Sequence, residues 1–198
     1  MKTSSKLLIG AAVVIAALAV TYRAVNKAPD TSLDYSGQML AVISDGGCSD
    51  CHSDKPNIPF YAKLPVAKQL IMKHIEDGYQ SFDIVPFTEA LSNGTAPSEV
   101  DLAKVEKCVL DGTMPMYQYY LVHWGSSLTD AKEQAMLEGI KAIRANFWPN
   151  ELAAEEFKNE CIRPVPDLVE FDPAKAELGK LLYNDTRLSA DGTISCAT

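Results

Sequence analysis

The hydrophobic pattern of the chain begins with an uninterrupted apolar run near the N-terminus. Lys2 and Lys6 precede a stretch of 16 uncharged, largely apolar residues from Leu7 to Tyr22. If the Arg23 side chain extends toward the membrane surface, the stretch reaches Val25 and contains 19 residues. A helix needs about 20 such residues to cross a bilayer. The pattern therefore predicts a membrane-spanning helix.

The role of this helix has two interpretations. We favour an uncleaved membrane anchor. The alternative is a removable signal peptide that is cleaved near the small residues Ala17-Leu18-Ala19. Arg23 and Lys27 lie beyond the run and blunt the charge asymmetry that would set its orientation. In both cases the remainder of the chain is expected to be exported.

Further along the chain, apolar residues recur at helical spacing and no segment shows the alternation of a strand. This periodicity predicts an all-α fold. Three prolines within residues 53–65 indicate an ordered loop instead of a long helix. The expected helices cover residues 35–44, stopped by Gly46-Gly47; residues 66–77, stopped by Gly78; the stretch from the cap Ser98 to Gly112; the stretch from Thr129 to Phe147; and the stretch from Asp172-Pro173 to Tyr183.

The composition changes after residue 148, where three prolines stand among many acidic residues, as is typical of a linker. We therefore expect an anchor and tether at residues 1–30, a helical domain at 31–148, a linker at 149–171 and the start of a second domain at 172–198.

The net charge limits the choice of partners. The chain has 18 basic and 26 acidic residues, and four of the basic residues lie within residues 1–28, which contain no acidic residue. Residues 29–198 therefore carry 14 basic against 26 acidic side chains, a formal charge of −12. A surface this acidic repels phosphate backbones and argues against nucleic acid as a partner. It suits a basic electron-transfer partner, and it equally suits plain solubility.

The strongest chemical motif is Cys48-Ser-Asp-Cys51-His52. Two cysteines three residues apart lie on one side of a helical turn, so both thiols can bond to one edge of a haem. The histidine that follows then supplies the proximal nitrogen ligand of the iron. The motif predicts one covalently attached haem c. The alternatives are a structural or metal-binding cysteine pair and an exported thiol oxidoreductase, and the oxidoreductase would leave His52 and Met114 without a purpose.

The sixth ligand of the iron is expected to be Met114. It follows the helix stop Asp111-Gly112 and precedes Pro115, which favours an extended backbone that holds the thioether away from any helix. Met116 is the nearest competitor. His74, in mid-helix, is better explained as a histidine at the edge of the core, and His123 as a structural histidine with a haem propionate as its alternative partner.

Other residues are left with a structural interpretation or an open one. Phe60, Tyr61 and Tyr117 are interpreted as walls of the haem pocket. Cys108 and Cys161 either pair with each other in an oxidising compartment or remain buried free thiols.

Four stretches together resemble a known family. Gly47-Cys-Ser-Asp-Cys-His52 with its proline-rich loop, Gly78-Tyr-Gln-Ser-Phe82, and Thr113-Met-Pro-Met-Tyr-Gln-Tyr-Tyr-Leu-Val-His-Trp124 resemble the N-terminal haem domain of membrane-anchored, three-haem bacterial cytochrome c peroxidases, also called quinol peroxidases. Residues 172–198 resemble the opening of the catalytic di-haem portion of these enzymes.

This resemblance implies a cytochrome c-like domain that accepts electrons from the quinol pool or a small donor protein. The domain would pass them to a downstream di-haem domain of the same chain, which reduces hydrogen peroxide to water. It implies anchoring on the periplasmic side of the inner membrane. Carried over by motif, Cys48 and Cys51 attach the haem, and His52 and Met114 ligate its iron. Cys196 would be the first thioether cysteine of a second haem motif that the sequence does not complete, so the resemblance also implies a fragment of a longer protein. The alternative is a stand-alone, membrane-tethered mono-haem carrier without catalysis.

Overall fold

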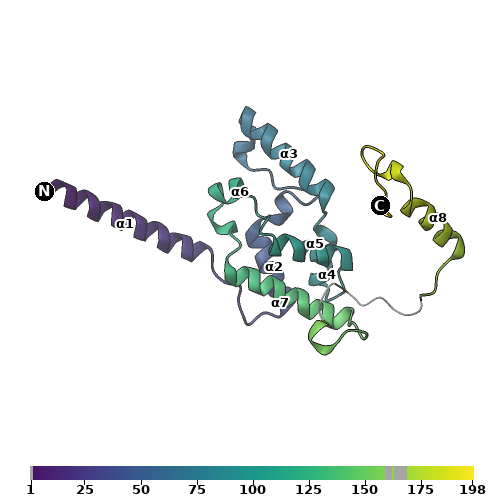
Figure 1. Cartoon of the computed structure of the whole chain (residues 1–198). Coiled ribbons are helices and arrows are strands. Elements are labelled where there is room, and N and C mark those ends of the chain that lie inside the picture. Colours follow the sequence, from purple (N-terminus) through teal and green to yellow (C-terminus); the bar gives the residue numbers. More distant parts are fainter. Residues whose placement is uncertain (1, 159–161, 163–168) are drawn as a thin grey trace. The chain divides into compact units, whose positions relative to one another are not determined.

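The computed structural model describes residues 2–158, 162 and 169–198. Every regular element among these residues is helical (Figure 1), which confirms the all-α fold class and is consistent with a cytochrome c-like domain. The chain divides into two compact units, Met1–Cys161 and Ile162–Thr198, and each is described by itself. The finer domain boundaries expected at residues 30, 148 and 171 remain predictions.

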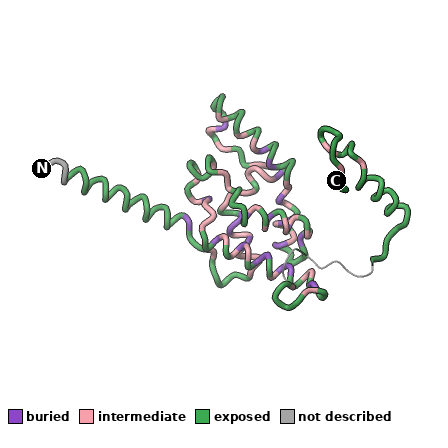
Figure 2. Tube along the Cα trace, in the orientation of Figure 1, coloured by how far each residue is buried: buried purple, intermediate pink, exposed green. Residues whose placement is uncertain are grey.

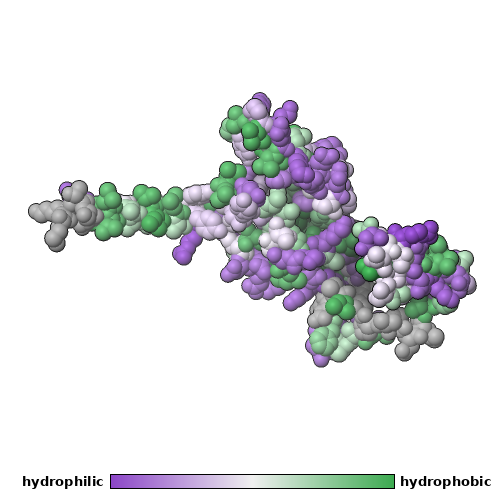
Figure 3. All heavy atoms as spheres, turned by 45° about the horizontal axis from the view of Figure 1, so that its top comes forward, coloured by the Kyte–Doolittle hydropathy of each residue, from purple (hydrophilic) through white to green (hydrophobic). Residues whose placement is uncertain are grey.

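The N-terminal helix α1 spans Lys2–Val25. Its stretch Lys6–Val25 is the one helix in the described part of the chain that is long and apolar enough to cross a membrane. Apolar side chains are exposed along it, as Figure 3 shows. These features fit a membrane anchor and a signal sequence alike. At its end, the Asn26 amide donates hydrogen bonds to the carbonyls of Tyr22 (3.1 Å) and Trp124 (2.6 Å), which connects α1 to the following domain.

Four helices form the core of the first unit: α2 (Tyr35–Gly46), α4 (Val85–Ser92), α5 (Glu99–Leu110) and α7 (Asp130–Phe147). Buried positions gather inside this group (Figure 2), and α2 packs against α7 more extensively than any other pair of helices. Fully burying one apolar side chain stabilises a fold by about 1.5–3 kcal/mol, so this cluster holds the helices together. Its members are Met39, Val42, Ile43, Ile84, Phe87, Leu91, Leu102, Val105, Val109, Met136, Ile140 and Ile143.

Two buried cations of α7 fix it to its neighbours. Arg144 forms a two-pronged ion pair with the Glu106 carboxylate of α5, at 3.1 and 2.7 Å. Lys132 pairs with Asp45 of α2 at 2.9 Å and donates to the Gly125 carbonyl at 3.2 Å. Buried charges require partners of this kind, because leaving water without compensation is costly. The pairs therefore specify where α2, α5 and the loop before α7 meet.

Several predicted helix ends are confirmed. Gly47, in the left-handed conformation (φ 63°), ends α2, and the Ser98 hydroxyl accepts a hydrogen bond from the Asp101 N–H at the start of α5. Thr129 precedes α7 as expected, although its hydroxyl makes no capping hydrogen bond.

The prediction that Gly78 stops a helix is wrong. Helix α3 spans Pro65–Ser81 and continues through Gly78, which is buried inside it. The N-terminal part of α3 is also less buried than an amphipathic helix would be. Val66 and Leu70 are 82% and 50% exposed. Ile75 is buried, where α3 reaches the rest of the domain.

Two short helices were not predicted. Helix α4 follows the segment after α3. Helix α6 (Tyr117–Val122) follows residues 111–116, which contain Met114 and Met116 and which we call the methionine loop. Both are shorter than the window in which helical periodicity becomes clear, since six or eight residues complete only about two turns.

The second unit contains α8 (Pro173–Tyr183). Its start is as predicted, because the Asp172 carboxylate accepts hydrogen bonds from the N–H groups of Ala174 (2.8 Å) and Lys175 (3.4 Å). A short 3-10 turn, Thr186–Leu188, follows. None of the described residues of this unit is buried.

Candidate haem site

The cysteine motif lies on a tight turn directly after α2. Gly47 reverses the chain, and residues Cys48–Asp50 form a single 3-10 turn that Cys51 closes. The His52 N–H donates to the Cys48 carbonyl at 3.0 Å, which completes a helical loop around the motif. Both cysteines and the histidine are therefore presented by one turn of backbone, as attachment to one edge of a haem requires.

The His52 ring is held in one orientation by a distant segment. Its Nδ1 lies 2.9 Å from the Phe82 carbonyl, and because a carbonyl only accepts, Nδ1 carries the proton. The Ile84 N–H donates to the His52 carbonyl at 2.9 Å, so backbone and ring are both anchored to residues 82–84. In the neutral ring, the bond to Phe82 leaves Nε2 as the unprotonated nitrogen. Metal-ligating histidines show this arrangement, in which the second nitrogen fixes the tautomer.

Helix α3 approaches the motif closely at Gly78. A Cβ atom at this position would lie 2.8 Å from the Cys51 carbonyl oxygen, closer than such contacts occur. The glycine therefore permits α3 to pack directly on the backbone of Cys51. Gly78 serves this close packing and does not end the helix.

An aromatic cluster joins the motif to the segment after the methionine loop. We call Asp50, Tyr61, Tyr119 and His123 the Tyr119 cluster. The Tyr119 hydroxyl donates to Asp50 at 2.8 Å, and the Tyr119 ring stacks on His123 with centroids 3.9 Å apart. A side chain at Gly47 would overlap with the Tyr119 hydroxyl, so the glycine is needed for space as well as for its left-handed backbone.

The hydrogen bonds of His123 assign it a structural role. Its Nδ1 lies 3.0 Å from the Tyr119 carbonyl and therefore carries the proton, so Nε2 accepts from the Tyr61 hydroxyl at 2.9 Å. Both ring nitrogens are engaged by protein groups, which supports the structural interpretation over the propionate alternative. Burial raises the pKa of Tyr61, and burial followed by the bond to Asp50 raises the pKa of Tyr119. Both phenols therefore stay protonated and act as donors.

Cys108 provides a second link between the motif and the methionine loop. The residue Cys48 is only partly buried, but its sulfur is enclosed. This burial raises the pKa of Cys48 to about 12, and the neighbouring Cys108 contributes a smaller part of the increase. Burial also raises the pKa of Cys108, against hydrogen bonds from the Thr113 side chain and the Met114 backbone. Cys108 is thus a neighbour of both Cys48 and the Met114 backbone. Cys161, its predicted alternative partner in a disulfide, lies outside the described residues.

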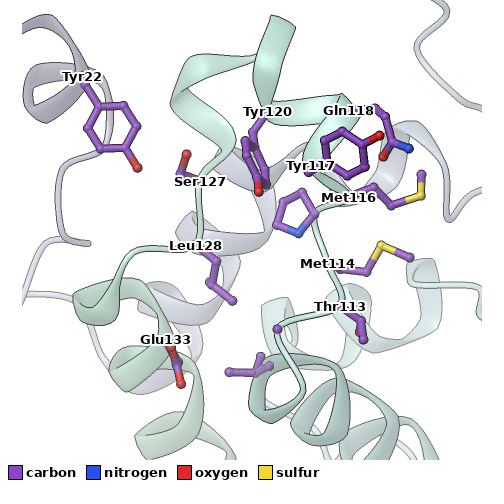
Figure 4. Close-up of a pocket in the computed structure, with 13 residues that line it drawn as sticks. Tyr22, Thr113, Met114, Met116, Tyr117, Gln118, Tyr120, Ser127, Leu128 and Glu133 are labelled. Carbon is purple, nitrogen blue, oxygen red and sulfur yellow. The ribbon is translucent and has the colours of Figure 1, made fainter. Parts of the chain in front are cut away.

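Met114 lies where the sequence predicts, in a segment without regular structure between α5 and α6. The residue is 37% exposed, and the Met114–Pro115 peptide is cis. Figure 4 shows Met114 and Met116 pointing to the same side of this segment, away from Tyr22. Both thioethers are thus available on one side, so the choice of Met114 over Met116 stays a prediction.

The residues present fit a c-type haem. Two thiols on one turn, an imidazole whose Nδ1 is engaged, and a thioether loop connected to the same turn through Cys108 and Tyr119 are the donors that such a group requires. Cys196 lies in the second unit and is exposed.

Sequence reasoning missed the support that Phe82 and Cys108 give to this site. Phe82 belongs to a segment that carries the family resemblance, whereas nothing in the sequence pattern connects Cys108 with the cysteine motif.

Comparison with known proteins identifies a haem-binding family. Residues 10–142 match the family described as haem-binding domain, and the chain belongs to that family. Residues 173–198 match the family described as di-haem cytochrome c peroxidase. The chain is also 35% identical over 167 residues to the cytochrome c peroxidase Ccp of Escherichia coli (strain K12). The match covers 84% of this chain and 36% of that relative, so the chain spans about a third of the relative's length. No solved structure matches significantly.

These findings define a haem electron-transfer region of the bacterial cytochrome c peroxidase type. The family resemblance seen in the motifs is thereby confirmed.

Proposed function

We propose that this chain is the electron-input region of a peroxidase, with one haem c bonded to Cys48 and Cys51 and ligated by His52 and Met114. The observation that carries the proposal is the hydrogen bond between His52 Nδ1 and the Phe82 carbonyl. It reserves Nε2 for iron on the same turn that presents both thiols. A haem held in this way supplies one-electron transfer.

The protein residues have distinct roles in this proposal. Cys48 and Cys51 hold the haem edge, and Phe82 orients the His52 ring. The Tyr119 cluster and Cys108 hold the methionine loop in register with the cysteine motif. With a histidine and a methionine as ligands, the iron has no open position for peroxide, which suits a relay and does not suit peroxide chemistry at this site.

The peroxidase role rests on the second unit. The match of residues 173–198 to the di-haem cytochrome c peroxidase family supports a di-haem portion as the electron acceptor, with hydrogen peroxide reduced to water there. Cys196 would then be the first thioether cysteine of that portion. Helix α1 is long and apolar enough to anchor the chain in a membrane. In this proposal the domain lies on the periplasmic side of the inner membrane and takes electrons from a quinol or a small donor protein.

A stand-alone mono-haem carrier is the second candidate, favoured by the complete set of haem-binding residues within the first unit. Turnover of hydrogen peroxide separates the two. The chain by itself is expected to show no enzymatic peroxide turnover, and a protein in which a di-haem portion follows residue 198 is expected to show it. A longer protein that takes up electrons but never reduces peroxide would establish the carrier.

The ligand assignment is tested with a matched pair of variants. Met114→Ala is expected to abolish the sulfur-to-iron charge-transfer band at the red edge of the visible spectrum and to lower the reduction potential, whereas Met116→Ala leaves both in place. The reverse result would move the ligand by two residues. Loss of the band in neither variant would exclude methionine ligation from this loop.

A further inference from the structure

Three exposed apolar side chains stand close together in the sequence where α1 meets the helical domain. Leu121 and Val122, at the end of α6, are 63% and 67% exposed, and the exposed Trp124 follows them. We call Leu121, Val122 and Trp124 the α6 face. Groups of exposed apolar side chains are typical of surfaces that contact another protein or a membrane. The α6 face therefore lacks the partner that would cover it.

The end of α1 lies next to the α6 face. Asn26, the residue after α1, donates a hydrogen bond to the Trp124 carbonyl at 2.6 Å. A Cβ atom at Gly125 would lie 3.5 Å from the Val25 carbonyl oxygen, so this turn of backbone packs on the last residue of the apolar stretch. With α1 in a bilayer, the α6 face is held where the membrane meets water. Tryptophan is enriched at this depth.

A second exposed apolar segment adjoins the α6 face. The 3-10 turn Phe60–Lys63 is joined to the end of α6 by the hydrogen bond between the Tyr61 hydroxyl and His123 Nε2, at 2.9 Å. Leu64 and Val66, directly after this turn, are both exposed. The apolar surface beside the end of α1 thus continues from α6 to the start of α3.

The charge of this second segment is opposite to that of the exported part of the chain, which carries a formal charge of −12. Residues 55–75 contain four lysines and no acidic residue. Lys73 pairs with Asp77 at 3.1 Å, whereas Lys63 and Lys68 form no ion pair with any described residue. Basic side chains that border apolar ones are typical of surfaces that bind anionic lipids. An acidic domain would otherwise be repelled by such lipids.

We propose that the α6 face and residues 63–68 lie in the headgroup region of an anionic bilayer and hold the haem domain against the membrane. The three side chains of the α6 face enter the bilayer surface, and Lys63 and Lys68 contact lipid phosphates. The inference goes beyond the proposed function and shares with it only α1 as an uncleaved anchor. A domain tethered through α1 alone can turn on the membrane, whereas this second contact fixes which side faces the lipid.

The test measures the depth of each tryptophan in the haem-loaded full chain, inserted through α1 into nanodiscs that contain phosphatidylglycerol. The chain has two tryptophans, and Trp148 follows α7, outside the proposed surface. Trp148→Phe leaves Trp124 as the reporter, and Trp124→Phe leaves Trp148. Brominated lipids quench tryptophan on contact. Trp124 is expected to lose most of its emission, relative to the same nanodiscs without bromine, and Trp148 is expected to keep most of its own.

A matched pair of double variants tests the apolar contact, with Trp124 as the reporter. Leu121→Asp with Val122→Asp is expected to lower the ratio of docked to undocked domain at least about tenfold, because two apolar side chains no longer enter the lipid. Leu110→Asp with Val100→Asp makes the same changes at similarly exposed positions of α5, 63% and 65%, and is expected to leave the quenching unchanged. Circular dichroism and haem absorbance verify that each variant folds.

A second matched pair tests the lysines. Lys63→Gln with Lys68→Gln is expected to reduce the quenching of Trp124 in nanodiscs that contain phosphatidylglycerol. Lys107→Gln with Lys141→Gln removes two exposed lysines from α5 and α7 and lowers the net charge equally, so it is expected to have no effect. Equal quenching in the two double variants would overturn the assignment of an anionic lipid.

The outcomes separate this inference from the proposed function. Brominated lipid that quenches Trp124 no more than Trp148 would overturn the inference and would mean that protein or haem covers the α6 face. This comparison needs no charged substitution, so it decides the question even if the aspartate variants do not fold. A chain without covalent haem would overturn the proposed function, whereas the quenching of Trp124 in that chain would still report on the membrane contact.

Discussion

Cys48 and Cys196 are both candidate first cysteines of a haem motif, and they lie in regions of opposite character. Cys48 follows a helix whose apolar residues are buried in a core shared by four helices, and its sulfur is enclosed by protein. Cys196 lies in a unit with no buried residue among those described. Apolar residues of its helix α8 are exposed, Leu181 at 69% among them. A motif therefore supplies chemistry, and only packing supplies a site with fixed geometry.

The largest expected difference between the two regions is in the haem itself. Replacing Cys48 and Cys51 together by alanine is expected to remove all covalently bound haem, because both thioether bonds depend on them. Cys196→Ala is expected to leave the haem content unchanged. A haem-stained denaturing gel measures both. Loss of stain in Cys196→Ala would show that the second region already holds haem.

Core truncation compares the two regions by their stability. Ile140→Ala on α7 removes a fully buried side chain and is expected to cost about 2–5 kcal/mol of unfolding free energy. Leu181→Ala on α8 removes an exposed one and is expected to cost less than about 0.5 kcal/mol. Urea unfolding followed by circular dichroism measures the difference. Equal costs would mean that α8 is packed in solution.

A glycine pair tests whether packing fixes the attachment turn. Gly47 and Gly94 both have left-handed backbones (φ 63° and 65°), so replacement by alanine costs each about 1–2 kcal/mol from backbone strain. Only Gly47 would also overlap with the Tyr119 hydroxyl. Gly47→Ala is therefore expected to be the more destabilising, and Gly47→Ala combined with Tyr119→Phe is expected to recover part of the difference. No recovery would remove Tyr119 from the explanation.

The smallest expected effect is on thiol reactivity in the haem-free chain. Burial raises the pKa of Cys48 to about 12, so its alkylation is expected to rise only at strongly alkaline pH. The exposed Cys196 is expected to react first. Mass spectrometry of alkylated peptides measures the order, and faster labelling of Cys48 would contradict its enclosure.

The same pKa difference affects stability. An unfolded chain releases a cysteine proton near pH 8.5, whereas folded Cys48 does so near pH 12, so the unfolding free energy should fall as pH rises through this window.

Much of the fold and part of the site follow from the sequence alone. The apolar run of α1, the stops at Gly47 and Gly112, and the caps Ser98 and Asp172 act within one or two helical turns. The motif from Cys48 to His52 is equally local, so its chemistry could be predicted without any knowledge of packing.

The tertiary structure alone decided what supports that motif. The bond from His52 to Phe82 spans 30 residues, and the bond from Asp50 to Tyr119 spans 69. Neither partner is set by spacing along the chain, because each depends on how α3, α4 and α6 pack around the turn. Gly78 illustrates the same limit. A glycine near a helix end looks like a stop when judged by backbone propensity, but here the close approach of the Cys51 carbonyl requires it. Local propensities act over a few residues, whereas the contacts that orient a ligand form between helices far apart in the sequence.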